Sequence, residues 1–159
     1  MMELVNEINK LTLYCQGKGY TEVTPEIVEL CCPPDLSSTI FDIMDACGSG
    51  NANTALGTLD KLITNKEPIP RIRVSIVNHI KALIMANDAG SAARLVDRTG
   101  MNDFRAKKLV AQSQNFSMKN LISLYLAASD SDSEFKHGLI DERYSLEIIL
   151  VKASAKTNV

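Results

Sequence analysis

Apolar residues recur every three or four positions along most of this chain, the spacing of a helix that buries one face. The clearest stripe lies in residues 68–86, where isoleucine or leucine returns at positions 69, 72, 76, 80 and 83. Residues 52–63 carry a second stripe, with their polar side chains on the opposite face. No segment alternates apolar and polar residues in the way of a half-buried strand. The pattern predicts an all-α chain.

Capping residues and helix breakers divide this pattern into nine predicted helices. Prolines 33 and 34 separate the first two helices from the rest, because neither residue donates a backbone hydrogen bond. The expected N-caps are Thr24, Ser38 or Thr39, Asn51, Asn102, Ser117 and Asp141. The predicted helices are 3–15, 25–32, 40–47, 52–63, 68–86, 92–98, 103–114, 118–137 and 141–153.

Composition narrows the class of protein. The chain has 159 residues, a net charge of −2 and 45% hydrophobic residues without tryptophan, so aliphatic side chains must build the core. No apolar run reaches the roughly 20 residues of a membrane span, and the N-terminus lacks the pattern of a signal peptide. The four cysteines, Cys15, Cys31, Cys32 and Cys47, lack paired-ligand spacing and are expected to be buried, reduced thiols. A cytoplasmic protein without metal or membrane is predicted.

Catalytic chemistry has little support in the sequence. The glycine pairs lack the spacing that wraps backbone amides around phosphates, so neither ATP hydrolysis nor another cofactor is expected. A small hydrolase stays as an alternative, with His79 and His137 as its only neutral-pH bases. No nucleophile motif accompanies them. The chain is predicted to be no enzyme, with no catalytic residues.

Residues 91–119 have the layout of a helix-turn-helix. They hold six basic and two acidic residues, a local charge of +4 in a chain that totals −2. Arg105, Lys107 and Lys108 are therefore candidates for contact with DNA phosphates or with a partner. Asp103 at the leading end of the second helix would repel phosphate, so sequence-specific DNA binding is the alternative rather than the main hypothesis.

Three further features point to contacts within or between subunits. Arg73 falls inside an apolar arc and is expected to reach water at the helix end, with a partner carboxylate as the alternative. Asp132 lies on an apolar stripe four residues before Lys136, which predicts an ion pair whose loss in Asp132→Ala destabilises the fold. The last helix is apolar nearly all round, which makes three residues candidate subunit contacts: Leu146, Ile149 and Leu150.

Six short segments together resemble the C-terminal portion of the delta subunit of bacterial DNA polymerase III, a clamp-loader family. They are 6–11 (NEINKL), 24–28 (TPEIV), 40–46 (IFDIMDA), 55–60 (ALGTLD), 104–109 (FRAKKL) and 132–138 (DSEFKHG). Each is short, and their order and spacing carry the resemblance. It implies a helical bundle-like collar domain over residues 37–159, preceded by a two-helix remnant of an ATPase-type lid over residues 1–33.

The resemblance also implies a function. Such subunits sit in a five-membered ring held together by collar domains, and the ring loads the sliding clamp onto primed DNA. This chain would be a fragment that lacks the N-terminal ATPase-like domain, through which the clamp is gripped. Its partners would be the other clamp-loader subunits, with primed DNA contacted weakly or indirectly, and Lys136 would be one DNA-proximal residue.

Overall fold

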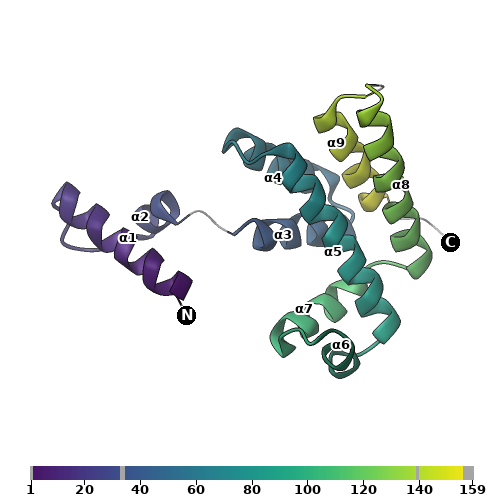
Figure 1. Cartoon of the computed structure of the whole chain (residues 1–159), viewed down its shortest axis with the longest axis horizontal. Coiled ribbons are helices and arrows are strands. Elements are labelled where there is room, and N and C mark those ends of the chain that lie inside the picture. Colours follow the sequence, from purple (N-terminus) through teal and green to yellow (C-terminus); the bar gives the residue numbers. More distant parts are fainter. Residues whose placement is uncertain (1, 33–34, 139, 156–159) are drawn as a thin grey trace. The chain divides into compact units, whose positions relative to one another are not determined.

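The structure is a computed structural model that describes residues 2–32, 35–138 and 140–155, and their side chains except at positions 2, 3, 29, 132, 134 and 136. All regular structure in these residues is helical, which confirms the all-α prediction. The chain divides into two compact units, Met1–Asp35 and Leu36–Val159 (Figure 1).

The first unit consists of helix α1 (Met2–Lys18) packed against helix α2 (Pro25–Cys31). The first helix was predicted over residues 3–15, but α1 continues to Lys18, and the chain turns at Gly19, whose φ is +72°. Thr24 precedes α2 without a side-chain capping bond. Two helices cover little apolar surface, and several large side chains stay exposed: Leu4, Val5, Ile8, Leu13, Val23 and Leu30.

The second unit contains the other seven described helices. They are α3 (Leu36–Gly48), α4 (Ala52–Thr64), α5 (Ile69–Ala89), α6 (Ala92–Thr99), α7 (Asp103–Ser113), α8 (Met118–Lys136) and α9 (Glu142–Ser154). The side chains of Asn51, Asn102, Ser117 and Asp141 accept the predicted N-cap hydrogen bonds. The start of α3 was predicted too late, because Leu36 is already helical and packs into the core.

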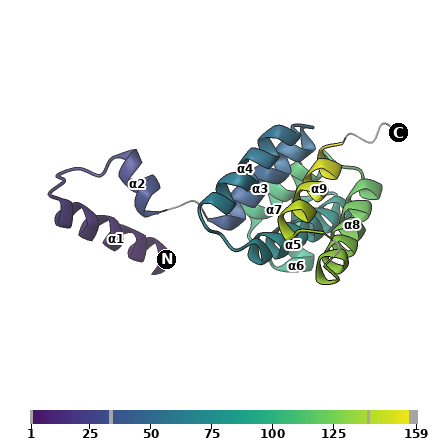
Figure 2. The same cartoon turned by 90° about the horizontal axis from the view of Figure 1, so that it is seen from above.

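Helix α5 is the centre of this unit and contacts α3, α6, α7, α8 and α9. Ile72, Ile76, Ile80 and Leu83, the stripe read from the sequence, are fully buried on it. Figure 1 shows α6 and α7 at the C-terminal end of α5, and α8 and α9 side by side as an antiparallel pair. Viewed from above, α3 and α4 lie together on the side of α9 opposite α8 (Figure 2). Helix α9 contacts both of them.

One glycine marks a close approach between segments far apart in the sequence. A Cβ atom on Gly48, the last residue of α3, would lie 2.9 Å from the Cβ of Asn115 and 3.0 Å from the ring of Phe116. Those two residues connect α7 to α8, and the Phe116 ring is buried. Gly57 on α4 has open space at the same position.

Of the helices described, none is both long and apolar enough to cross a membrane.

Candidate subunit interface and nucleic-acid surface

The apolar residues of α9 that were expected to contact a partner lie in the core of their own unit. Leu146, Ile149 and Leu150 are 0%, 1% and 0% exposed, and they pack in one cluster with α3 and α5. They are therefore core residues here, not surface residues. The prediction failed because α9 is enclosed on several sides by α3, α4, α5 and α8, which accounts for its apolar sequence without any partner.

The surface that α8 and α9 do present is a groove of about 480 Å³. Its apolar lining comes from Ile122, Leu126 and Ala127 of α8 and Ile148 of α9. Lys119, Asp130 and Lys152 also line it. The groove was not predicted from the sequence, because Ile122 and Leu126 lie outside the buried apolar stripe of α8, which includes Leu121, Leu124 and Ala128. That displacement from the stripe was the signal that could have identified them.

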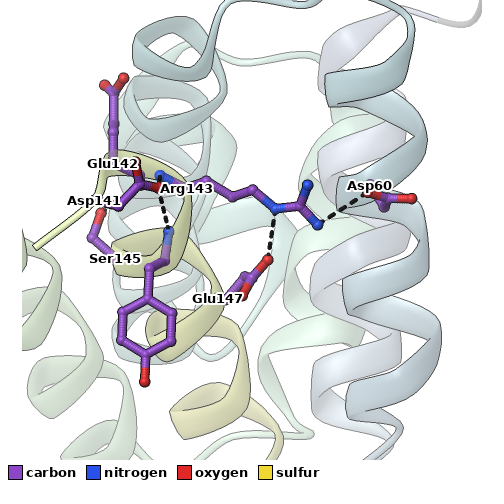
Figure 3. Close-up of polar contacts among 7 residues, drawn as sticks. Asp60, Asp141, Glu142, Arg143, Ser145 and Glu147 are labelled. Carbon is purple, nitrogen blue, oxygen red and sulfur yellow. Dashed lines mark hydrogen bonds and ion pairs between the residues drawn. The ribbon is translucent and has the colours of Figure 1, made fainter.

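The N-terminal end of α9 is fastened by polar contacts (Figure 3). The Asp141 carboxylate accepts hydrogen bonds from the backbone N–H groups of Arg143 and Tyr144. The Arg143 guanidinium donates to Glu147 at 2.8 Å and reaches Asp60 of α4 at 3.1 Å. The Asp141 and Glu147 contacts are local to the start of α9, and the exposed Arg143–Asp60 ion pair is the contact among them that joins α9 to α4.

Arg73 of α5 also contacts the N-terminal end of α9. Its side chain is 5% exposed, so it does not reach water as expected. Its Nη2 donates to the Ser145 hydroxyl and, at 3.3 Å, to the Glu142 carbonyl, while its Cζ lies 5.7 Å from the centre of the Phe135 ring. The Nε and Nη1 groups have no hydrogen-bond partner in the part of the chain that the structure describes. Arg73 thus serves as a buried link between α5, α8 and α9.

The predicted helix-turn-helix corresponds to α6 and α7, which contact each other. Arg105, Lys107 and Lys108 are exposed on α7. Lys107 pairs with Asp103 at 2.7 Å, and the Lys108 Nζ lies 4.8 Å from the ring centre of Phe104 and 5.7 Å from that of Phe41. Lys107 and Lys108 thus already interact with neighbouring side chains, which makes them less available to a phosphate.

Acidic and aromatic residues of α3 lie next to this basic segment. A cavity of about 230 Å³ is lined by Arg105 and Lys108 together with Asp42, Phe41 and the exposed Phe104. The Asp42 carboxylate reduces the local positive potential that the sequence count suggested. The surface combines two cations, one carboxylate and an exposed ring, and it fits a salt-sensitive contact better than a tight grip on DNA.

His79 connects α5 to its neighbours. Its Nε2 lies 2.6 Å from the Gln112 Oε1, and its ring meets Phe41 edge to face. The Gln112 amide nitrogen in turn donates to the Phe41 carbonyl at 2.9 Å. Burial lowers the pKa of His79. The His79 ring thus joins α3, α5 and α7.

The remaining predicted residues are placed as follows. The side chains of Asp132 and Lys136 lie outside the described residues, so their pairing stays a prediction. His137 follows α8, and its Nδ1 lies 2.7 Å from the Ser133 carbonyl. All four cysteines are free; two are buried (Cys15 and Cys47), whereas Cys31 and Cys32 are only half-buried, contrary to expectation. Within the described ranges, no three His, Cys, Asp or Glu side chains are grouped to hold a metal ion.

Comparison with known proteins settles the family. Residues 37–153 match the family described as DNA polymerase III delta subunit, C-terminal domain. The chain belongs to this family. The match covers nearly all of the second unit, from the start of α3 to the end of α9, and it confirms the resemblance read from the sequence. The family is a clamp-loader subunit domain and not the catalytic domain of a polymerase.

A solved structure shares the fold. The Bacillus subtilis DNA clamp loader delta protein (YqeN) superposes with a TM-score of 0.79 at 21% sequence identity. The match covers 95% of this chain and 45% of the Bacillus protein, so the chain spans a little under half the length of that relative. No match to the chain was found among curated proteins.

Proposed function

We propose that the second unit is the collar domain of a clamp-loader delta subunit, which holds that subunit in a five-membered ring. The family match over residues 37–153 carries this proposal. The ring would load the sliding clamp onto primed DNA during replication in the bacterial cytoplasm. In this role the domain binds neighbours and performs no chemistry.

The architecture of the second unit suits such a role. A single core built around α5 holds seven helices, and the polar contacts of Arg73 and Arg143 fix α9 to α5 and α4. A rigid domain of this kind loses little conformational freedom when it docks, which favours a stable assembly. The open groove between α8 and α9 offers surface for a neighbour without disturbing the core.

We infer that the first unit belongs to the lid subdomain of an ATPase-type fold. Its two helices expose Leu13 and Leu30 to 68% each, more apolar surface than a pair of helices can cover by itself. Further helices of a lid would cover these side chains. The grip on the sliding clamp would belong to an N-terminal domain of the full subunit, outside the residues of this chain.

Contact with DNA is proposed to be weak and to involve phosphates. Arg105, Lys107 and Lys108 are exposed, but Asp103 and Asp42 lie beside them. A joint replacement of the three cations by alanine should reduce any binding to primed DNA equally for all sequences and lower its salt dependence. Loss of binding to one particular duplex sequence would favour the helix-turn-helix alternative instead.

The assembly role is tested by mixing the purified chain with the sister clamp-loader subunits of the same organism at micromolar concentration. Sedimentation velocity should show the chain migrating with the sister subunits. The intact delta subunit serves as the positive control. If the intact subunit joins the assembly and this chain stays free under the same conditions, the collar proposal is refuted.

A further inference from the structure

The groove between α8 and α9 is lined by four aliphatic and five polar side chains, Ser123 and Ser131 among the polar ones, and its two largest aliphatic side chains on α8 are left exposed. Ile122 and Leu126 follow each other by one helical turn on α8 and are 46% and 56% exposed. Ile148 of α9 lines the same groove and is half-buried. A hollow between two packed helices, with large aliphatic side chains one turn apart, has the shape that receives the apolar face of a third helix.

The positively and negatively charged residues of the groove lie toward opposite ends of it. The two helices are antiparallel, so Lys119 near the start of α8 and Lys152 near the end of α9 both lie toward the open end of the pair. Asp130 lies nearer the turn, 11 residues after Lys119, or about 16 Å along the helix. None of the three has an ion-pair partner among the side chains that the structure describes. They are available to an external ligand.

This arrangement distinguishes among ligands. A nucleic acid or an anionic membrane would bring phosphates along the whole groove, including the end where Asp130 repels them. The dipole of an α-helix matches this arrangement of charges, because its C-terminal end carries partial negative charge and its N-terminal end partial positive charge. The lysine end of the groove therefore favours the C-terminal end of a docked helix, and the Asp130 end favours its N-terminal end.

We propose that this groove receives an amphipathic helix of a sister clamp-loader subunit. The helix places aliphatic residues at i and i+4 against Ile122 and Leu126, and carboxylates in its last turns face Lys119 and Lys152. This inference rests on the proposed collar function and names the surface and the partner chemistry through which that function is carried out.

The test measures the affinity of the full chain for the assembly of sister subunits, by isothermal titration calorimetry. Ile122→Asp and Leu126→Asp place a carboxylate under the docked helix, and each should weaken binding at least tenfold. Lys119→Glu combined with Lys152→Glu should weaken it several-fold and reduce its salt dependence. The matched control is Met85→Asp on α5, since Met85 is 45% exposed, close to the 46% of Ile122, and lies outside the groove. Urea unfolding of each variant checks that the fold is retained.

The outcomes separate the two proposals. If the parent chain binds and the groove variants bind equally well, the groove is not the interface, while the collar function stands. If the parent chain fails to bind where the intact subunit succeeds, the collar function fails and the groove assignment fails with it. An equal loss in Met85→Asp would also overturn the groove assignment. If the chain alone sediments as a dimer that Ile122→Asp dissociates, a second copy occupies the groove, and the proposed occupant is wrong.

Discussion

Gly48 and Gly57 form a matched pair for testing how tightly the second unit is packed. Both are helical glycines, and replacing a glycine inside a helix by alanine gains up to about 1 kcal/mol of stability, because glycine loses more backbone freedom on folding. At Gly57 on α4 a new Cβ atom meets nothing within 4 Å. Gly57→Ala should therefore show this gain, about 0.5–1 kcal/mol in the free energy of unfolding.

At Gly48 the same substitution would cause a steric clash. The added Cβ would lie 2.9 Å from the Asn115 Cβ and 3.0 and 3.1 Å from two ring atoms of Phe116. The ring is 5% exposed and belongs to the core, and a Cβ cannot rotate away, so helix or loop must move. Overpacking of this kind costs about 1–3 kcal/mol. Gly48→Ala should lose about 1–2 kcal/mol after the gain in helix propensity, the opposite sign to Gly57→Ala.

Urea unfolding followed by far-ultraviolet circular dichroism measures both variants against the parent. The transition midpoint should rise for Gly57→Ala and fall for Gly48→Ala, with similar slopes, because the surface exposed on unfolding does not change. The two free energies of unfolding should differ by about 1.5–3 kcal/mol. If Gly48→Ala is as stable as Gly57→Ala, the approach between α3 and the α7–α8 connection is not rigid, and the packing argument is wrong.

Three further predictions concern charge and thiol chemistry. Burial lowers the pKa of His79, so the unfolded chain binds a proton on this side chain more readily than the folded chain does. The folded state therefore loses stability relative to the unfolded state as the pH falls below about 6.5. His79→Leu should flatten the decline in midpoint between about pH 7 and pH 5, whereas His137→Ala at an exposed position should keep it. Burial raises the pKa of the Cys47 thiol, so iodoacetamide followed by mass spectrometry should label Cys31 first and Cys47 only after unfolding; equal native rates would contradict the burial. Arg143→Ala should lower the melting temperature slightly at low salt and not at about 1 M NaCl, and an equal loss at both would show that the Arg143 ion pairs are not its cause.

Most of the fold could be predicted from local patterns in the sequence. Caps such as Asn51 and Ser117 act within one helical turn, so their positions could be read directly, and the α5 stripe marked the face that the core covers. The errors came from contacts between distant segments. Leu36 is helical because it packs into the core of the second unit, and Arg73 is buried because α9 crosses above it. The position of Arg73 inside an apolar arc was visible in the sequence, but its partners on α9 were not, because they lie 69 and 72 residues further along the chain.

The candidate site was harder to predict for the same reason. An apolar last helix such as α9 is equally compatible with an interface and with a position between neighbouring helices. The tertiary arrangement shows that Leu146 and Leu150 face inward, whereas the outward position of Ile122 and Leu126 could have been predicted from their displacement from the apolar stripe of α8. The charge of residues 91–119 was also misleading, because it counts the basic residues of α7 without the carboxylate that α3 brings beside them, Asp42.

The polar fastening at the start of α9 has a kinetic consequence. Arg73 holds the start of this helix to α5, Arg143 contacts α4, and Leu146, Ile149 and Leu150 are buried in the core, so one wall of the groove is formed before any partner arrives. A preformed wall needs no slow rearrangement after encounter. Association should then proceed at the ordinary rate for two rigid surfaces, and groove substitutions should act mainly by shortening the lifetime of the complex.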